Sequence, residues 1–346
     1  MTDSLKASRG IVLWLFGTCF LIWLMIMLGG ATRLTHSGLS IVEWKPIVGI
    51  IPPLTETAWL AEFAKYQQFP EYQLVNHGMS LSEFKFIFFM EYAHRLLGRL
   101  IGLFFFLPLA YFWLRRQLSP RLKKLSGIVA ILGLAQGFMG WYMVKSGLVK
   151  DPSVSHYRLT AHLVLALMLF GIIFFEGLRQ LYPREKIVRG AGNVPVMLVH
   201  FSALAIVLTI IYGGFVAGLK AGKMYNTYPL MGGDFIPYEW AHLSPLWLNF
   251  LENAATVQWV HRTIAVATMI LVITAMTGLL RSNFGSVVKG TAKLMIAAIC
   301  FQVILGIMTL LHHVPVSLGT LHQGTAVVVL GLILLAIHNV HRRAYE

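Results

Sequence analysis

Long apolar runs dominate the hydrophobic pattern of this 346-residue chain. Each run holds roughly 18 residues or more, which is the length that a helix needs to cross the hydrocarbon core of a bilayer. The runs cover about residues 11–30, 96–114, 125–144, 159–178, 195–217, 263–280, 291–311 and 321–340. Because a helix satisfies its own backbone hydrogen bonds in lipid, the pattern predicts an all-α integral membrane protein with eight transmembrane helices.

Charges between the runs are unevenly distributed, and the net charge is +14. Alternate connections carry the basic groups Lys6 and Arg9; Arg115, Arg116, Arg121, Lys123 and Lys124; Arg179, Arg184, Lys186 and Arg189; Arg281, Lys289 and Lys293; and Arg342 and Arg343. The opposite connections mix bases with most of the acids. This positive-inside distribution predicts that both termini are cytoplasmic, and it favours anionic lipid headgroups over nucleic acid as the partner of the basic excess.

The start of the chain favours a bacterial cytoplasmic (inner) membrane. Only about ten residues precede the first run, which is too few for a transit peptide. That run is also long for a signal peptide and lacks an obvious small-residue cleavage site, so we expect it to be retained. The two cysteines, Cys19 and Cys300, fall inside runs, and neither is placed for a disulfide in a connection.

The chain also repeats itself. The stretch "GGATRLTHSGLSIVEWKPIVGIIPP" (29–53) aligns with "GGFVAGLKAGKMYNTYPLMGGDFIP" (213–237), and glycines and prolines match, among them Gly38 with Gly222 and Pro53 with Pro237, while Pro46 and Pro229 differ by one position. "EYAHRLLG" (91–98) likewise aligns with "QWVHRTIA" (258–265), and the pair Gln136 and Gly140 aligns with Gln302 and Gly306. Shared glycines and prolines in polar connections are hard to obtain by chance, so we interpret the chain as a duplication.

The duplication predicts two four-helix bundles, residues 1–186 and 187–346. Four crossings return the chain to the starting side, so the copies are parallel and related by a pseudo-twofold axis along the membrane normal. Small residues such as Gly133 and Gly137, or Gly98 and Gly102, would let neighbouring helices approach closely.

Four histidines share one position in the pattern. His94, His162, His261 and His322 stand at the starts of the second, fourth, sixth and eighth runs, which predicts one depth at the outer end. The repeat matches His94 with His261 and His162 with His322, so each bundle carries two. Two facing imidazoles suit the axial positions of six-coordinate haem iron. Zinc is the rival, but it favours tetrahedral clusters with cysteine, carboxylate or three histidines, so haem fits better.

An arginine follows the first histidine of each pair, Arg95 in one half and Arg262 in the other. A guanidinium group binds carboxylates through a fork of hydrogen bonds, so these arginines are candidates for contacts with haem propionates. The alternative is that both side chains extend to lipid phosphates.

The two halves differ one helical turn before these histidines. Glu91 stands in the first half and Gln258 at the matching position of the second. A desolvated carboxyl can exchange protons near neutral pH, so we predict chemistry at the first site and haem retention with electron transfer at the second. The alternative for Glu91 is an ion pair with Arg95 or Arg99.

Several motifs together resemble the haem A synthase family, in the branch shared by proteobacteria and mitochondria. They are "EFKFIFFMEYAHRLLGRLIG" (83–102), "GGATRLTHSGLSI" (29–41), "AGKMYNTYPLMGGDFIP" (221–237), "VQWVHRTIAV" (257–266) and "LGTLHQ" (318–323). The resemblance covers nearly the whole chain. Some bacterial members carry a cysteine pair in an outer loop, and this chain does not.

The resemblance implies oxidation of the C8 methyl group of haem O to a formyl group, which makes haem A for cytochrome oxidase. It implies that His94 and His162 bind the substrate haem with Glu91 as the catalytic residue, and that His261 and His322 bind a haem b cofactor. An apolar pocket in the first half would suit the farnesyl tail of haem O. Haem O synthase and the cytochrome oxidase assembly machinery are the implied partners, and a homo-oligomer stays open.

Two other functions are compatible with parts of the pattern. A di-haem b electron-transfer protein or quinone oxidoreductase explains the histidines and the repeat, but not the single carboxylate. A transporter or haem exporter would be expected to carry polar residues deep in the runs, whereas here they gather at one edge.

Overall fold

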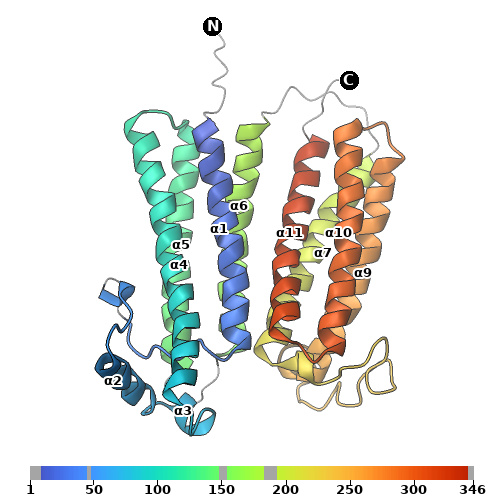
Figure 1. Cartoon of the computed structure of the whole chain (residues 1–346). Coiled ribbons are helices and arrows are strands. Elements are labelled where there is room, and N and C mark those ends of the chain that lie inside the picture. The colour runs from blue at the N-terminus through green and yellow to red at the C-terminus, as the bar shows by residue number, and fades with distance from the viewer. Residues whose placement is uncertain (1–8, 45–47, 148–153, 183–192, 342–346) are drawn as a thin grey trace. The chain divides into compact units, whose positions relative to one another are not determined.

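The computed structural model describes residues 9–44, 48–147, 154–182 and 193–341. Eight helices within these residues are long and apolar enough to cross a membrane, which confirms the predicted all-α, multi-pass membrane fold. They are α1 (Arg9–Leu34), α4 (Leu81–Leu114), α5 (Pro120–Gly147), α6 (His156–Leu181), α7 (Asn193–Gly218), α9 (Ala254–Leu280), α10 (Ser286–Leu311) and α11 (Val316–His341) (Figure 1). Short helices lie in two connections: η1 (Val48–Ile50), α2 (Glu56–Tyr66) and α3 (Pro70–Leu74), then η2 (Ala221–Lys223), η3 (Leu246–Leu248) and α8 (Asn249–Glu252).

Helix α4 begins well before the apolar run that predicted it. A capping box starts it at Ser80, whose Oγ accepts from the Glu83 N–H at 3.3 Å while the Glu83 carboxylate accepts from the Ser80 N–H at 2.8 Å. Phe84, Phe88 and Glu91 are buried at helical spacing along these first turns. The predicted start near residue 96 was therefore wrong, because this part of the helix buries one face against the chain rather than in lipid.

An aromatic cluster supplies the surface that covers the first turns of α4. Trp59 and Tyr66 of α2 are buried together with Phe84, Ile87 and Phe88 of α4. The ring centroids of Tyr66 and Phe84 lie 5.2 Å apart, and those of Trp59 and Phe88 lie 4.9 Å apart. This packing anchors the connection between α1 and α4 on the part of α4 that carries Glu91.

The four histidines consequently lie inside helices rather than at their starts. His94 is preceded in α4 by the capped first turns, and the other three are about two turns inside α6, α9 and α11. The prediction that the histidines begin the spans was therefore wrong. A count of apolar residues misses the helical turns that are covered by the connections between the long helices.

The described chain forms two compact units. One comprises Phe20–Ala166, and the other joins the chain up to Cys19 with the chain from Leu167 onward. In the second unit α9 packs against α7 and α10, and α11 packs against α10 and α7, so these four helices close a bundle (Figure 1). The predicted boundary between residues 186 and 187 lies outside the described residues and stays a prediction, and so does the place of Pro46 in the repeat.

Candidate functional site

The first pair of histidines comes together within the unit Phe20–Ala166. His94 of α4 and His162 of α6 are close enough for their charges to interact. Each ring faces a glycine of the preceding long helix: a Cβ at Gly29 of α1 would lie 3.2 Å from His94 Nε2, and one at Gly140 of α5 would lie 3.3 Å from His162 Cε1. Glycine leaves room for an imidazole beside the backbone at both positions.

The second pair has the same arrangement in the other unit. His261 of α9 and His322 of α11 are close enough for their charges to interact. A Cβ at Gly213 of α7 would lie 3.2 Å from His261 Cε1, and one at Gly306 of α10 would lie 2.8 Å from His322 Cε1. All four predicted histidines are thus brought together as two pairs, each ring against a glycine.

Hydrogen bonds orient the rings of the second pair. Nδ1 of His261 lies 3.1 Å from the Thr209 carbonyl oxygen, an arrangement that fixes the tautomer of a ligating histidine and directs Nε2 toward a metal. The Gln302 side-chain amide lies 3.2 Å from His322 Nδ1 and also donates to the His322 carbonyl at 3.0 Å. His261 therefore has the ring orientation that a ligating histidine needs, and Gln302 holds the ring of His322 in place.

The first pair is supported by the matching glutamine. The Gln136 amide lies 3.5 Å from His162 Nε2. Nδ1 of His162 and Oε1 of Gln136 are buried, and the described residues supply them with no hydrogen-bond partner; the same is true of Oε1 of Gln302. Buried polar atoms are normally paired, so these atoms indicate that a bound group completes each site. The two pairs thus fit haem as that group.

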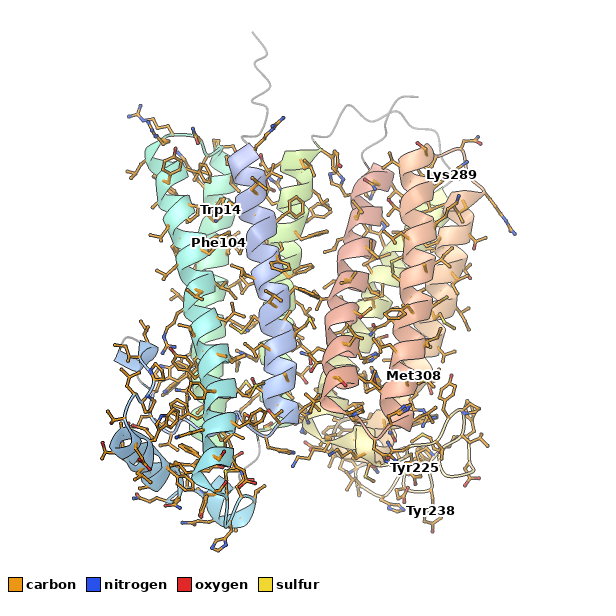
Figure 2. The ribbon with its side chains drawn as sticks, in the orientation of Figure 1. Trp14, Phe104, Tyr225, Tyr238, Lys289 and Met308 are labelled. Atoms are coloured by element: carbon orange, nitrogen blue, oxygen red, sulfur yellow. The ribbon has the colours of Figure 1, made fainter. Side chains whose placement is uncertain are left out.

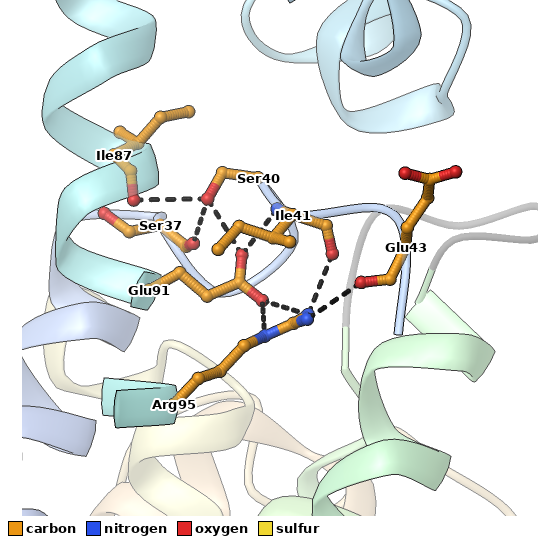
Figure 3. A network of polar contacts seen from close by, with 7 residues as sticks. All are labelled: Ser37, Ser40, Ile41, Glu43, Ile87, Glu91 and Arg95. Carbon is orange, nitrogen blue, oxygen red and sulfur yellow. Dashed lines mark hydrogen bonds and ion pairs between the residues drawn. The ribbon is translucent and has the colours of Figure 1, made fainter. Parts of the chain in front are cut away.

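Glu91 lies one turn before Arg95 in α4, and its side chain is buried with 3% exposure. Its Oε1 accepts from Arg95 Nε at 3.0 Å and from Arg95 Nη2 at 2.6 Å. Its Oε2 accepts from Ser40 Oγ and from the Ile41 N–H, both at 2.8 Å (Figure 3). An ionised carboxylate offers about four acceptor sites, so the donors present fill them all. The alternative of an ion pair with Arg95 is confirmed, and the pair is part of a larger network.

Arg95 also binds the connection that follows α1. Its Nη1 donates to the Glu43 carbonyl at 3.0 Å and its Nη2 to the Ile41 carbonyl at 2.8 Å. The guanidinium carbon lies 5.0 Å from the centre of the Trp44 ring, which adds a cation–π contact. Arg95 therefore links α4 and the Glu91 carboxylate to the connection between α1 and α4.

Arg262 is placed in the same way in the second unit. Its Nη2 donates to the carbonyls of Thr227 at 2.8 Å and Pro229 at 2.9 Å. Its guanidinium carbon lies 5.3 Å from the centre of the Tyr228 ring. Nη1 of Arg262 is buried and has no hydrogen-bond partner among the described residues. Both arginines predicted to contact propionates therefore bind connections between long helices here, and Arg262 keeps one nitrogen for a further acceptor.

Gln258 occupies the position that matches Glu91 and is 2% exposed. Its Nε2 donates to the Tyr225 carbonyl at 3.0 Å. The Tyr225 hydroxyl in turn donates to the Glu239 carboxylate, which raises the pKa of Tyr225 to about 12 and lowers the pKa of Glu239. A neutral amide, that of Gln258, thus holds the connection between α7 and α9. The nearest carboxylate in this network, that of Glu239, contacts Tyr225 rather than Gln258.

An open apolar groove lies along α5 in the first unit. Trp44, Gly133, Leu134, Gly137, Phe138 and Trp141 line its volume of about 470 Å³. A Cβ at Gly133 or Gly137 would meet nothing within 4 Å, so the predicted close helix approach at these glycines is not seen among the described residues. Gly137 follows Gln136 in α5, so the groove and the glutamine that contacts His162 belong to the same helix.

Known proteins resemble the chain over nearly its whole length. The COX15-CtaA family, described as cytochrome oxidase assembly protein, matches residues 12–334. The haem A synthase of Rhodospirillum centenum is 46% identical over 336 residues, which cover 97% of this chain and 89% of that protein. The haem A synthase of Nitrosospira multiformis is 46% identical over 347 residues (99% and 96%), and haem A synthase COX15 of Arabidopsis thaliana is 43% identical over 354 residues (99% and 77%). The chain belongs to the haem A synthase (COX15-CtaA) family.

Proposed function

We propose that this chain converts haem O to haem A by oxidising the C8 methyl group of haem O to a formyl group. Family membership and the two histidine pairs support this reaction. The observation that carries it is the difference between the pairs, because Glu91 brings a buried carboxylate to one site and Gln258 brings a neutral amide to the other. Two sites for electron transfer alone would not require that difference.

The site with Glu91 would hold the substrate. His94 and His162 are the proposed axial ligands of haem O, and His261 and His322 are the proposed ligands of a haem b cofactor. The hydrogen bond from His261 to the Thr209 carbonyl supports the second assignment, because it sets the ring as a ligand requires. When bound, haem b supplies a group that transfers electrons.

Glu91 would act as a fixed negative charge beside the substrate. Removing electrons from a methyl carbon develops positive charge there, and a carboxylate already held by four donors stabilises that charge without rearrangement. The same four bonds leave no acceptor site for a proton unless one of them breaks. The arrangement therefore favours charge stabilisation over proton abstraction.

The groove along α5 would take the farnesyl tail of haem O. Its walls are aromatic and aliphatic, and its volume of about 470 Å³ lies in the usual range for small-molecule sites. Arg262, through Nη1, would bind a propionate of haem b. Arg95 is less suited to a propionate, because Glu91 and two backbone carbonyls engage three of its nitrogens.

We also propose that the two halves, residues 1–186 and 187–346, are parallel bundles related by a pseudo-twofold axis along the membrane normal. Matched contacts support the repeat. They are Gly29–His94 with Gly213–His261, Gly140–His162 with Gly306–His322, and Gln136–His162 with Gln302–His322.

The proposed location is the bacterial cytoplasmic membrane with both termini in the cytoplasm. Eight crossings return the chain to its starting side. Figure 2 shows Lys289 at one end of α10, and Tyr225 and Tyr238 in the connection at the opposite end of that unit. Basic residues mark the cytoplasmic side, so the histidine sites would face outward. Haem O synthase would supply the substrate, and cytochrome oxidase assembly would use the product.

Pigment analysis tests the function. The chain is expressed in a host without haem A, with and without a haem O synthase, and the extracted haems are identified by mass. We expect haem A only when haem O is supplied, and haem b in both cases. Haem b without haem A, in membranes that contain haem O, would instead identify a di-haem electron-transfer protein.

A further inference from the structure

Ser40 is a buried hydroxyl beside the candidate catalytic carboxylate, with 2% exposure. Three acceptors lie within its reach: Glu91 Oε2 at 2.8 Å, the Ser37 carbonyl at 3.0 Å and the Ile87 carbonyl at 3.2 Å. A hydroxyl has one proton, and a charged acceptor binds it more strongly than a neutral carbonyl does. Ser40 therefore donates to Glu91, which is also the shortest of the three contacts (Figure 3).

Comparison of the two halves distinguishes the contacts that hold a connection on its helix from the contacts that hold the Glu91 carboxylate. In the aligned stretches, Glu43 and Trp44 correspond to Thr227 and Tyr228. Each arginine donates to the first residue of its pair and stacks on the second, Arg95 in one half and Arg262 in the other. This arginine clamp occurs at both sites. Its common task is therefore to hold the connection that precedes α4 or α9 on that helix.

Ser40 is not repeated. The aligned stretches place Met224 opposite Ser40, just as Gln258 stands opposite Glu91. The Met224 side chain is 51% exposed, so its position serves the second site in no comparable way. The hydroxyl and the carboxylate that accepts from it therefore occur together, in one half only, while the clamp around them occurs in both.

We propose that Ser40 is a positioning residue of the haem O reaction, which acts by fixing Oε2 of Glu91. The inference rests on the proposed function and adds a residue to it. Ser40 and the Ile41 N–H hold one carboxylate oxygen, and Arg95 holds the other, so the carboxylate cannot turn without breaking bonds at both ends. A charge that stabilises a transition state works best when it is already in place.

Steady-state kinetics of haem O conversion by the purified full-length protein tests this role. Ser40→Ala removes the donor, and we expect kcat to fall roughly 10- to 100-fold, as for the loss of a hydrogen bond to a charged group, while KM stays within about twofold. Ser40→Thr keeps the hydroxyl and restores most of kcat. Met224→Ala is the matched control from the other half, and its kcat stays at the wild-type value.

Infrared spectroscopy gives a readout that does not depend on turnover. The carboxylate band of Glu91 is assigned by its loss in Glu91→Gln, and we expect Ser40→Ala to shift it while haem b content stays unchanged. An unshifted band, a wild-type kcat in Ser40→Ala, or failure of Ser40→Thr to restore kcat would each overturn the inference. Failure of the wild-type protein to convert haem O would overturn the proposed function instead.

Discussion

A buried carboxylate distinguishes the first candidate site at the scale of single residues. Burying a charge is costly unless donors and a countercharge replace the lost water, and Glu91 obtains both from Arg95, Ser40 and the Ile41 N–H. Its counterpart Gln258 is equally buried but neutral, and its amide donates to the Tyr225 carbonyl. At this scale, one carboxyl oxygen in place of an amide nitrogen distinguishes a site that carries charge from one that does not.

Glu91→Gln tests the charge with almost no change in size. We expect haem A formation to fall by about 10²- to 10³-fold, because a preorganised electrostatic group is lost, while haem b remains bound. Gln258→Glu is the reciprocal control, and it should lower haem b content because a buried carboxylate replaces the amide that donates to the Tyr225 carbonyl. Haem A formation at the wild-type rate in Glu91→Gln would rule out the charge role.

At the scale of elements, α4 and α5 shape the first site. The aromatic cluster with α2 covers the first turns of α4, so this helix extends beyond its apolar run. These turns carry Glu91, which lies against the connection between α1 and α4. In α5, Gly133 and Gly137 line an apolar groove together with Trp44 of the connection between α1 and α4. Glycine costs a helix about 1 kcal/mol relative to alanine, and no described neighbour requires it at these two positions.

Filling this groove should affect the tail of the substrate rather than the macrocycle. We expect Gly137→Leu to raise KM for haem O at least about tenfold, the effect of losing roughly 1.4 kcal/mol of binding, and to leave the binding of haem b, which has no farnesyl tail, unchanged. Gly127→Leu is the control, because Gly127 lies on the same helix with open space around it and does not line the groove. Equal effects of the two variants would exclude a tail in the groove.

At the scale of the whole molecule, the two candidate sites lie in different compact units. His94 and His162 belong to one unit, and His261 and His322 to the other. Substitutions in one pair therefore leave the helices that carry the other pair unchanged. The family relationship covers both units, since residues 12–334 match.

Histidine variants should therefore separate the two proposed haems. We expect His261→Ala to reduce bound haem b to less than about a tenth of the wild-type level, since loss of an axial ligand weakens binding by more than a hydrogen bond does. His94→Ala should retain haem b and lose haem A formation. Optical spectra and pigment extraction of the purified variants measure both. A loss of haem b in His94→Ala alone would reverse the assignment of the two sites.

The sequence by itself determined the all-helical membrane fold, the eight spans, and the contrast between Glu91 and Gln258. These follow from hydrophobic periodicity and from aligned motifs, which are properties of neighbouring residues along the chain. Only the tertiary structure decided where α4 begins, which donors reach Glu91, and that Arg95 and Arg262 hold the connections that precede α4 and α9. Those depend on a connection folding back onto a helix about fifty positions later in the chain, and local spacing does not specify such a contact. "HSGLSI" belonged to a family motif in the sequence, and the fold made Ser40 the partner of a buried carboxylate.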